Sequence, residues 1–162
     1  MKKYFFFLII LTHSISAQYT NINIIKEIHT KDKGMVVCAH PLASEAGAKI
    51  LKMGGNAFDA AIATQFALAV VYPQAGNIGG GGFLIGYTNK GEKIALEYRE
   101  PAAKKASKDM YLDKNGNANT DLSQNGRLAV GIPGSVSGMY FTHQKYGKLP
   151  ISVLIQPAID LA

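Results

Sequence analysis

Residues 72–100 read YPQAGNIGGGGFLIGYTNKGEKIALEYRE, and they carry the strongest structural pattern in the chain. Four consecutive glycines, residues 79–82, form a loop that can turn sharply and adopt positive φ at little steric cost. Residues 83–87 are apolar and typical of a strand, residues 88–91 are typical of a turn, and residues 93–99 alternate between polar and apolar side chains. The stretch therefore predicts a glycine loop followed by a β-hairpin.

The second strand of this hairpin ends in an arginine. Because side chains alternate along a strand, one face holds Ile94, Leu96 and Tyr98. Arg99 lies on the other face. If the apolar face is core, Arg99 leaves the strand end on the side where a cleft can use it. On the residues alone, the alternative is an exposed arginine paired with Glu97 or Glu100, since exposed charges are the norm.

Length and composition predict one domain of ordinary size. The chain has 162 residues, of which 48% are hydrophobic, enough to bury a sizeable core. Its formal net charge is +6, but beyond residue 3 only Lys104 and Lys105 are adjacent, and no aromatic residues alternate with the lysines. Nucleic-acid binding requires a concentrated basic face, so we exclude this class of partner.

The first 17 residues have the layout of a secretory signal peptide. Two lysines precede the apolar run 4–11, and small residues lead to a predicted cleavage site after Ala17. The run is too short to cross a bilayer, so no membrane span is expected after cleavage. The alternative is a hydrophobic N-terminus without a targeting role. We expect export to the periplasm or the cell exterior, with residues 18–33 as a loosely ordered N-terminus and residues 34–162 as the folded domain.

A strand and two helices are predicted before the glycine loop. Residues 35–39 are apolar and predict a strand that Pro41 interrupts. Residues 42–53 have apolar side chains at helical spacing, and two glycines end this helix. Asn56 is expected to cap a second helix, residues 57–71, which is apolar on all sides and therefore buried. Its alanines predict that it packs flat on a sheet.

Two side chains in this region are interpreted as structural. Gln65, a polar residue in the middle of the second helix, is expected to form a hydrogen bond in the core. Cys38 is the only cysteine, so the exported protein has no internal disulfide and depends on its core for stability. Its apolar neighbours favour a small buried side chain over a nucleophile.

After the hairpin, residues 113–117 predict a surface turn. An apolar run follows at 128–132, and Ser135 is expected to cap a helix that ends near Tyr146. A last helix begins after Pro150, and its apolar pattern continues to the final residue, so we expect the sequence to be a piece of a longer protein. Together the patterns predict an α/β fold with two or three strands and four helices.

Metal and phosphate sites are not predicted. His29, His40 and His143 are dispersed and lack partners at metal-ligand spacing. A phosphate loop needs a lysine and a helix after its glycines, whereas a strand is predicted here. The turn that begins at Asp113 lacks the spaced carboxylates of a calcium loop. We interpret the glycine loop as structural, packing beneath a site.

Four blocks of the sequence resemble, in the same order, the N-terminal region of the large subunit of γ-glutamyltransferases, also called γ-glutamyltranspeptidases or glutathione hydrolases. The blocks are LKMGGNAFDAAIA at 51–63, YPQAGNIGGGGF at 72–83, YREPA at 98–102 and GIPGSVSG at 131–138. Glycine runs recur widely, so one block would be a weak signal, but four in order are specific. The resemblance covers about residues 34–162.

This resemblance implies an N-terminal nucleophile hydrolase fold, a four-layer αββα sandwich, of which the chain is an incomplete N-terminal portion. The family is made as a precursor that cuts itself into a large and a small subunit. The new N-terminal threonine of the small subunit attacks the γ-glutamyl amide of glutathione, with its own α-amine as the base. The acyl-enzyme then passes the γ-glutamyl group to water or to an amino acid.

The resemblance places the nucleophile beyond Ala162, so no catalytic residue is expected in this chain and the chain alone is predicted to be inactive. No cofactor is implied. The expected partners are the γ-glutamyl substrate and the rest of the chain's own precursor, including the small subunit. Arg99 matches the family arginine that holds the α-carboxylate of the γ-glutamyl group, and Glu100 could orient its guanidinium.

Two other functions stay open on the sequence. The first is a related acylase on the same scaffold that acts on other amides, such as cephalosporin side chains or poly-γ-glutamate. The second is a non-catalytic, truncated product, whose exposed apolar surface would favour association or aggregation.

Overall fold

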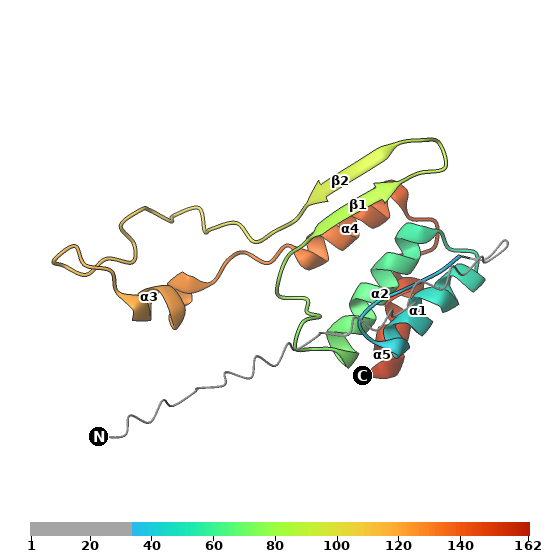
Figure 1. Cartoon of the computed structure of the whole chain (residues 1–162), viewed down its shortest axis with the longest axis horizontal. Helices are drawn as coiled ribbons and strands as arrows, with labels where there is room; N and C mark the ends of the chain where they lie inside the picture. The colour runs from blue at the N-terminus through green and yellow to red at the C-terminus, as the bar shows by residue number, and fades with distance from the viewer. Residues whose placement is uncertain (1–33) are drawn as a thin grey trace, which may run out of the picture. The chain divides into compact units, whose positions relative to one another are not determined.

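The computed structural model describes residues 34–162; the predicted signal peptide, 1–17, and the predicted loose N-terminus, 18–33, lie outside the described residues. Helices dominate this part of the chain, and one hairpin interrupts them (Figure 1). In chain order the elements are α1 (Pro41–Lys52), α2 (Ala57–Val71), β1 (Phe83–Tyr87), β2 (Lys93–Glu97), α3 (Thr120–Gln124), the 3₁₀ helix η1 (Arg127–Ala129), α4 (Ser135–Tyr146) and α5 (Ile151–Leu161).

The corner between α1 and α2 follows the sequence signals closely. Pro41 starts α1, and Gly54 ends it with φ +90, a conformation that disfavours residues with a Cβ. Asn56 caps α2: its side chain accepts hydrogen bonds from the amides of Phe58 and Asp59, while the Asp59 carboxylate accepts one from the Asn56 amide. This reciprocal capping box satisfies amides that the first turn of a helix leaves free. Both helices and their caps confirm the prediction.

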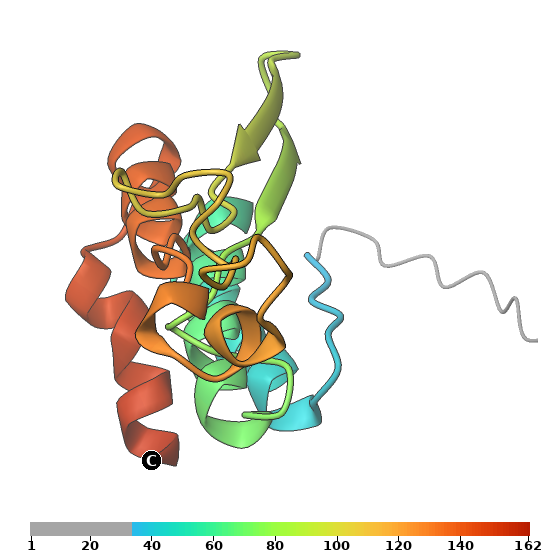
Figure 2. The ribbon, with the colours of Figure 1, turned by 90° about the vertical axis from the view of Figure 1, so that its left-hand side faces the viewer.

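Helix α2 is the centre of the helical layer, and the prediction that it packs flat on a sheet is wrong for the described residues. Both α1 and α5 pack against it (Figures 1 and 2). Its alanines allow close approach to the neighbouring helices instead, with Ala43 and Ala46 of α1 packed against Ala67. A second buried cluster joins α1, α2, α4 and α5 through Ile50, Ile62, Ala63, Met139 and Leu154.

A fully buried carboxylate ties the start of α2 to the loop between α4 and α5. Asp59 is 0% exposed and accepts hydrogen bonds from the amides of Lys148, at 3.0 and 3.2 Å, and Leu149, at 3.3 Å. The Asn56 side-chain amide donates to the Tyr146 carbonyl at 2.6 Å, and the rings of Phe58 and Tyr146 stack with centroids 4.9 Å apart. Together these contacts hold segments about 90 positions apart in the sequence.

The hairpin forms with the predicted strands. Strands β1 and β2 pair antiparallel, with Phe83 opposite Glu97 and Tyr87 opposite Lys93. Ile94 is buried, as the predicted inner face requires, while Arg99 is exposed. The two strands thus bring the polypeptide back beside the glycine loop.

Three details differ from the sequence prediction. Residues 35–39 form no strand because their backbone pairs with no strand in the described part of the chain. Helix α3 was not predicted; the Asn119 side chain caps it by accepting from two amides. Gly134, not Ser135, is the N-cap of α4, and Ser135 is its buried first residue. The described residues therefore hold two strands, four longer helices, the short helix α3 and the 3₁₀ helix η1.

The Asp59 contacts make a prediction about stability. In the full-length protein, Asp59→Ala should lower the free energy of unfolding by about 2–4 kcal/mol, because buried amides left without an acceptor are costly. Urea-induced unfolding followed by circular dichroism measures this loss. The matched control is Asp160→Ala. Asp160 lies 3.9 Å from Lys49 with both side chains more than half exposed, so the change should stay below about 0.5 kcal/mol. Equal effects of the two substitutions would contradict a structural role for the buried carboxylate.

Candidate functional site

The chain just beyond β2 lies between the glycine loop and the start of α4. The Tyr98 amide donates to the Gly82 carbonyl at 2.9 Å, and the Gly82 amide donates back at 3.4 Å, so the ladder of the hairpin continues past both strands. The amides of Gly134 and Ser135 both donate to the Gly80 carbonyl at 2.8 Å. Because the first amides of a helix have no partner within it, this carbonyl fixes the start of α4 to the loop.

Gly81 and Gly82 of the loop serve close approach rather than unusual dihedral angles. A methyl group on Gly81 would lie 2.6 Å from the Tyr98 carbonyl oxygen, 2.8 Å from Arg99 Cα and 2.7 Å from Glu100 Oε2. Residues 79–82 include no glycine with positive φ, so the predicted use of that conformation is wrong. The physical reason is that the backbone of residues 98–100 occupies the space where a side chain of Gly81 would stand. The interpretation of the loop as a structural support agrees with this packing.

Arg99 lines a pocket of about 530 Å³ between the end of β2 and α4. Its side chain is exposed, and neither Glu97 nor Glu100 forms an ion pair with it. The alternative of an arginine held by its neighbouring glutamates is therefore not the arrangement in this structure. The pocket walls are mainly apolar or backbone; they include Pro101, Ile132, Pro133, Gly134, Ser137, Gly138 and Phe141.

Glu100 does not line this pocket and packs against Gly81 and Gly131. Its carboxylate is close to the Cα of Gly81, and its Cβ approaches Gly131, where a methyl group would lie 2.8 Å away. The Pro101 carbonyl accepts a hydrogen bond from the Ile132 amide at 2.9 Å, which holds the segment before α4 against this stretch. The predicted role of Glu100 in orienting the guanidinium stays a prediction.

Tyr98 is a component of the site whose importance the sequence did not reveal. Its ring is half-buried and lies against Gly82 and Gly138. Burial raises the pKa of the Tyr98 phenol, and the neighbouring Gln65 side chain partly offsets this effect. The one signal in the sequence was Gly138, a glycine inside a predicted helix, where such a residue usually has a packing reason.

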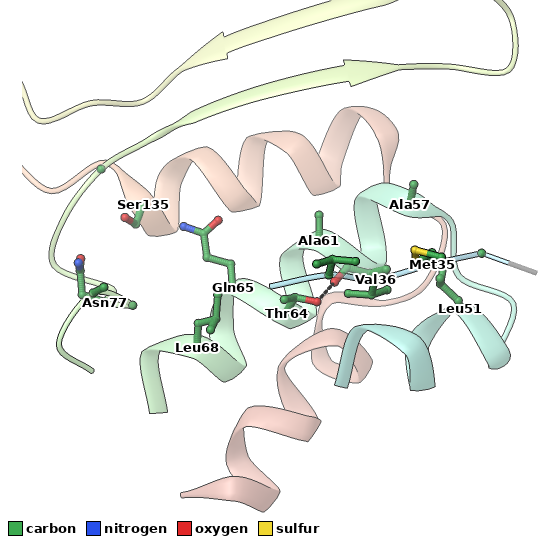
Figure 3. A pocket seen from close by; sticks show the side chains of 16 residues that line it. Met35, Val36, Leu51, Ala57, Ala61, Thr64, Gln65, Leu68, Asn77 and Ser135 are labelled. Atoms are coloured by element: carbon green, nitrogen blue, oxygen red, sulfur yellow. Dashed lines mark hydrogen bonds between the residues drawn. The ribbon is translucent and has the colours of Figure 1, made fainter. Parts of the chain in front are cut away.

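A larger hollow of about 620 Å³, with Gly81 in its lining, lies between α2 and the extended residues 34–37 (Figure 3). Thr64, Gln65, Asn77 and Ser135 contribute its polar side chains, and Thr64 donates to the Ala60 carbonyl. The residues that line it include no titratable side chain. Recognition of a charged group therefore favours the smaller pocket, whose lining includes the charged side chains of Arg99 and Glu97.

Residues 34–162 contain no group of three or more His, Cys, Asp and Glu side chains placed to hold a metal ion. His40 and His143 stay apart, and the His143 ring contacts the Leu149 carbonyl at 2.7 Å. His29 lies outside the described residues. Asp113 forms the predicted turn, in which its carboxylate accepts from the Asn115 and Asn117 amides.

Comparison with known proteins identifies the family. The family model described as Gamma-glutamyltranspeptidase matches residues 43–162. The chain belongs to the γ-glutamyltranspeptidase family. The glutathione hydrolase proenzyme of Pseudomonas sp. (strain A14) is 47% identical over 163 residues, which cover 100% of this chain and 28% of that protein. The chain thus spans little more than a quarter of the length of this relative.

Solved structures agree with this family. The γ-glutamyltranspeptidase of Helicobacter pylori is 54% identical with a TM-score of 0.79, over 84% of this chain and 39% of that one. The cephalosporin acylase of Bacillus halodurans is 29% identical with a TM-score of 0.62, over 84% of this chain and 26% of that one. The fold is therefore part of the N-terminal nucleophile hydrolase fold expected from the resemblance, with mixed helices and strands.

The glycine loop offers a matched pair of substitutions. Gly81→Ala should lower the free energy of unfolding of the full-length protein by about 1–3 kcal/mol, because a methyl group overpacks a contact with backbone that cannot move aside easily. Gly79→Ala in the same loop should be neutral or slightly stabilising, since nothing lies within 4 Å of the added methyl. Urea-induced unfolding compares the two. A larger loss at Gly79 than at Gly81 would show that the loop needs flexibility, not close approach.

Proposed function

We propose that this chain is the N-terminal part of the large subunit of an exported γ-glutamyltransferase, or glutathione hydrolase, and that Arg99 binds the α-carboxylate of the γ-glutamyl substrate. The observation that carries the proposal is Arg99 itself: an exposed guanidinium, unpaired with its neighbouring glutamates, at a pocket of a chain that belongs to this family. A guanidinium matches a carboxylate with two parallel hydrogen bonds. A lysine in its place would provide a charge without that geometry.

In this proposal the bond-breaking groups belong to the small subunit, outside this chain. The N-terminal threonine produced by self-cleavage attacks the γ-glutamyl amide carbon, its α-amine takes the hydroxyl proton, and the amine product leaves. Water or an amino acid then takes the γ-glutamyl group from the ester. The part of Arg99 is to hold the substrate by its distant end, which fixes the amide relative to the nucleophile. The chain alone would then bind weakly and catalyse nothing.

The proposed partner is the rest of the precursor, including the small subunit. Strand β1 supports this proposal with a row of apolar side chains on its outer face: Phe83 is 62%, Ile85 82% and Tyr87 71% exposed. Contiguous apolar surface of this kind is typical of a face that another segment covers. The relative from Pseudomonas sp. is itself named a proenzyme.

Export to the periplasm or the cell exterior is proposed from the first 17 residues alone, which lie outside the described structure. Among residues 34–162, no helix has the length and hydrophobicity needed to cross a membrane.

A related acylase is the second candidate, and the similarity to the cephalosporin acylase of Bacillus halodurans favours it. The two functions differ in what the pocket must bind. A γ-glutamyl substrate has a free α-carboxylate that suits Arg99, whereas an acylase substrate without that group gains nothing from a fixed guanidinium.

Replacement of Arg99 tests the proposal. In the full-length protein, Arg99→Ala should preserve self-cleavage on a gel but lower kcat/KM for a γ-glutamyl anilide about 10- to 100-fold, mostly through KM, because loss of a charge-assisted contact at an exposed site costs about 1.5–3 kcal/mol in total. Arg99→Lys should recover only part of this loss. Release of the chromophore measures both parameters.

Arg127→Ala is the matched control, because Arg127 is the other arginine of the chain and is exposed in η1. It should leave kcat/KM unchanged. If Arg99→Ala also left KM unchanged, Arg99 would be a surface charge and the proposed binding site would be wrong.

A further inference from the structure

We propose that Tyr98 is a positioning residue for Arg99, and that it acts because its ring is seated against Gly138 of α4. This inference rests on the carboxylate-binding role of Arg99 proposed above. It concerns the adjacent residue, which does not itself contact the substrate in this proposal.

The contact between Tyr98 and Gly138 leaves no room for a side chain. A methyl group on Gly138 would lie 2.5 and 2.7 Å from Cδ1 and Cδ2 of the Tyr98 ring, and closer still to Cγ. Real Cβ atoms do not approach other atoms this closely, and the contacted atoms are at the stiff base of the ring rather than at a flexible tip. Nearer the tip of the same ring, a methyl group on Gly82 would lie 2.9 Å from Cε2. The ring is therefore held between the glycine loop and α4.

The ring rather than the hydroxyl carries this seating. The Tyr98 hydroxyl donates to the Phe83 carbonyl at 3.5 Å, a long and weak hydrogen bond. The ring, by contrast, lies so close to Gly138 that a methyl group there would overlap it. A phenylalanine at this position would keep the ring contacts and lose the weak bond to Phe83 and the interaction of the hydroxyl with the Gln65 side chain.

The position of the Tyr98 ring determines the position of the backbone from which the Arg99 side chain extends. The Tyr98 backbone pairs with Gly82, and its carbonyl oxygen lies against Gly134, where a methyl group would collide with it. The side chain of Arg99 is exposed and is not held by Glu97 or Glu100. Its position in the pocket is consequently set by the direction in which its own backbone points. A small rotation of the backbone at residue 98 is amplified along the long arginine side chain, and a displacement of about 1 Å can cost 100-fold in rate.

Glycine at position 138 agrees with this role. Alanine is the better helix former, so helix propensity alone would favour alanine inside α4. Any loss caused by Gly138→Ala must therefore come from the displaced ring and not from the helix.

The test compares two substrates of the full-length protein: a γ-glutamyl anilide, and a 4-aminobutyryl anilide, which lacks only the α-carboxylate. The measured quantity is kcat/KM for the γ-glutamyl anilide divided by kcat/KM for the 4-aminobutyryl anilide. Gly138→Ala should lower this ratio about tenfold, since a misplaced guanidinium loses part of its charged hydrogen bonds to the carboxylate. Gly126→Ala is the control, because the closest atoms to its added methyl are 3.9 and 4.0 Å away. It should keep the ratio of the parent.

A second pair of variants keeps the test decisive if Gly138→Ala does not fold. Tyr98→Leu removes the ring and should lower the ratio, whereas Tyr98→Phe keeps the ring and should restore it. In an Arg99→Ala background, Tyr98→Leu should change the ratio no further, because the guanidinium through which it acts is gone.

Two results would overturn the inference, and they differ. If Tyr98→Leu and Gly138→Ala lower kcat/KM equally for both anilides, the ring has only a structural role, while the role of Arg99 stands. If Arg99→Ala itself leaves the ratio unchanged, the carboxylate site fails first, and the positioning role fails with it.

Discussion

The carbonyl oxygen of Gly80 accepts two backbone hydrogen bonds from the start of α4, and this contact joins segments more than 50 positions apart in the sequence. It is possible only because glycines at the contact leave the backbones free to approach. On one side, Gly81 lies against residues 98–100; on the other, Gly134 lies against the Tyr98 carbonyl. The end of the hairpin is therefore fixed by main-chain geometry, which bulky side chains could not reproduce.

The helices below the hairpin make this arrangement rigid. The first residues of α4 bond to the glycine loop. Just beyond its last residue, the amides of Lys148 and Leu149 donate hydrogen bonds to Asp59 of α2. The Asp59 carboxylate and the Arg99 guanidinium have contrasting environments. Asp59 is fully buried and satisfied by backbone amides, a structural use of charge, because an unpaired buried charge would be strongly destabilising. Arg99 is exposed at a pocket, where its charge is available to a ligand.

Helices were predictable where the local signals were complete. The pattern of α2 and its cap at Asn56 are local, so its bounds followed from the sequence alone. Residues 35–39 are an apolar run of the kind that forms a strand, but a strand also needs a partner, and the described residues supply none. The prediction of what α2 packs against was wrong for a similar reason. Small residues indicate that another element approaches closely, but they do not indicate which element it is.

The sequence by itself determined the hairpin, the helices with clear caps, and the resemblance that identifies the family, because each of these is written in short, contiguous patterns. It also singled out Arg99, from alternation along a strand and from a matching motif. Only the tertiary structure decided that Arg99 stands at a pocket beside α4, that Gly81 of the loop serves contact rather than positive φ, and that the Tyr98 ring lies on Gly138. These are contacts between residues far apart in the chain, and their distances depend on how the helices pack, which no local pattern encodes.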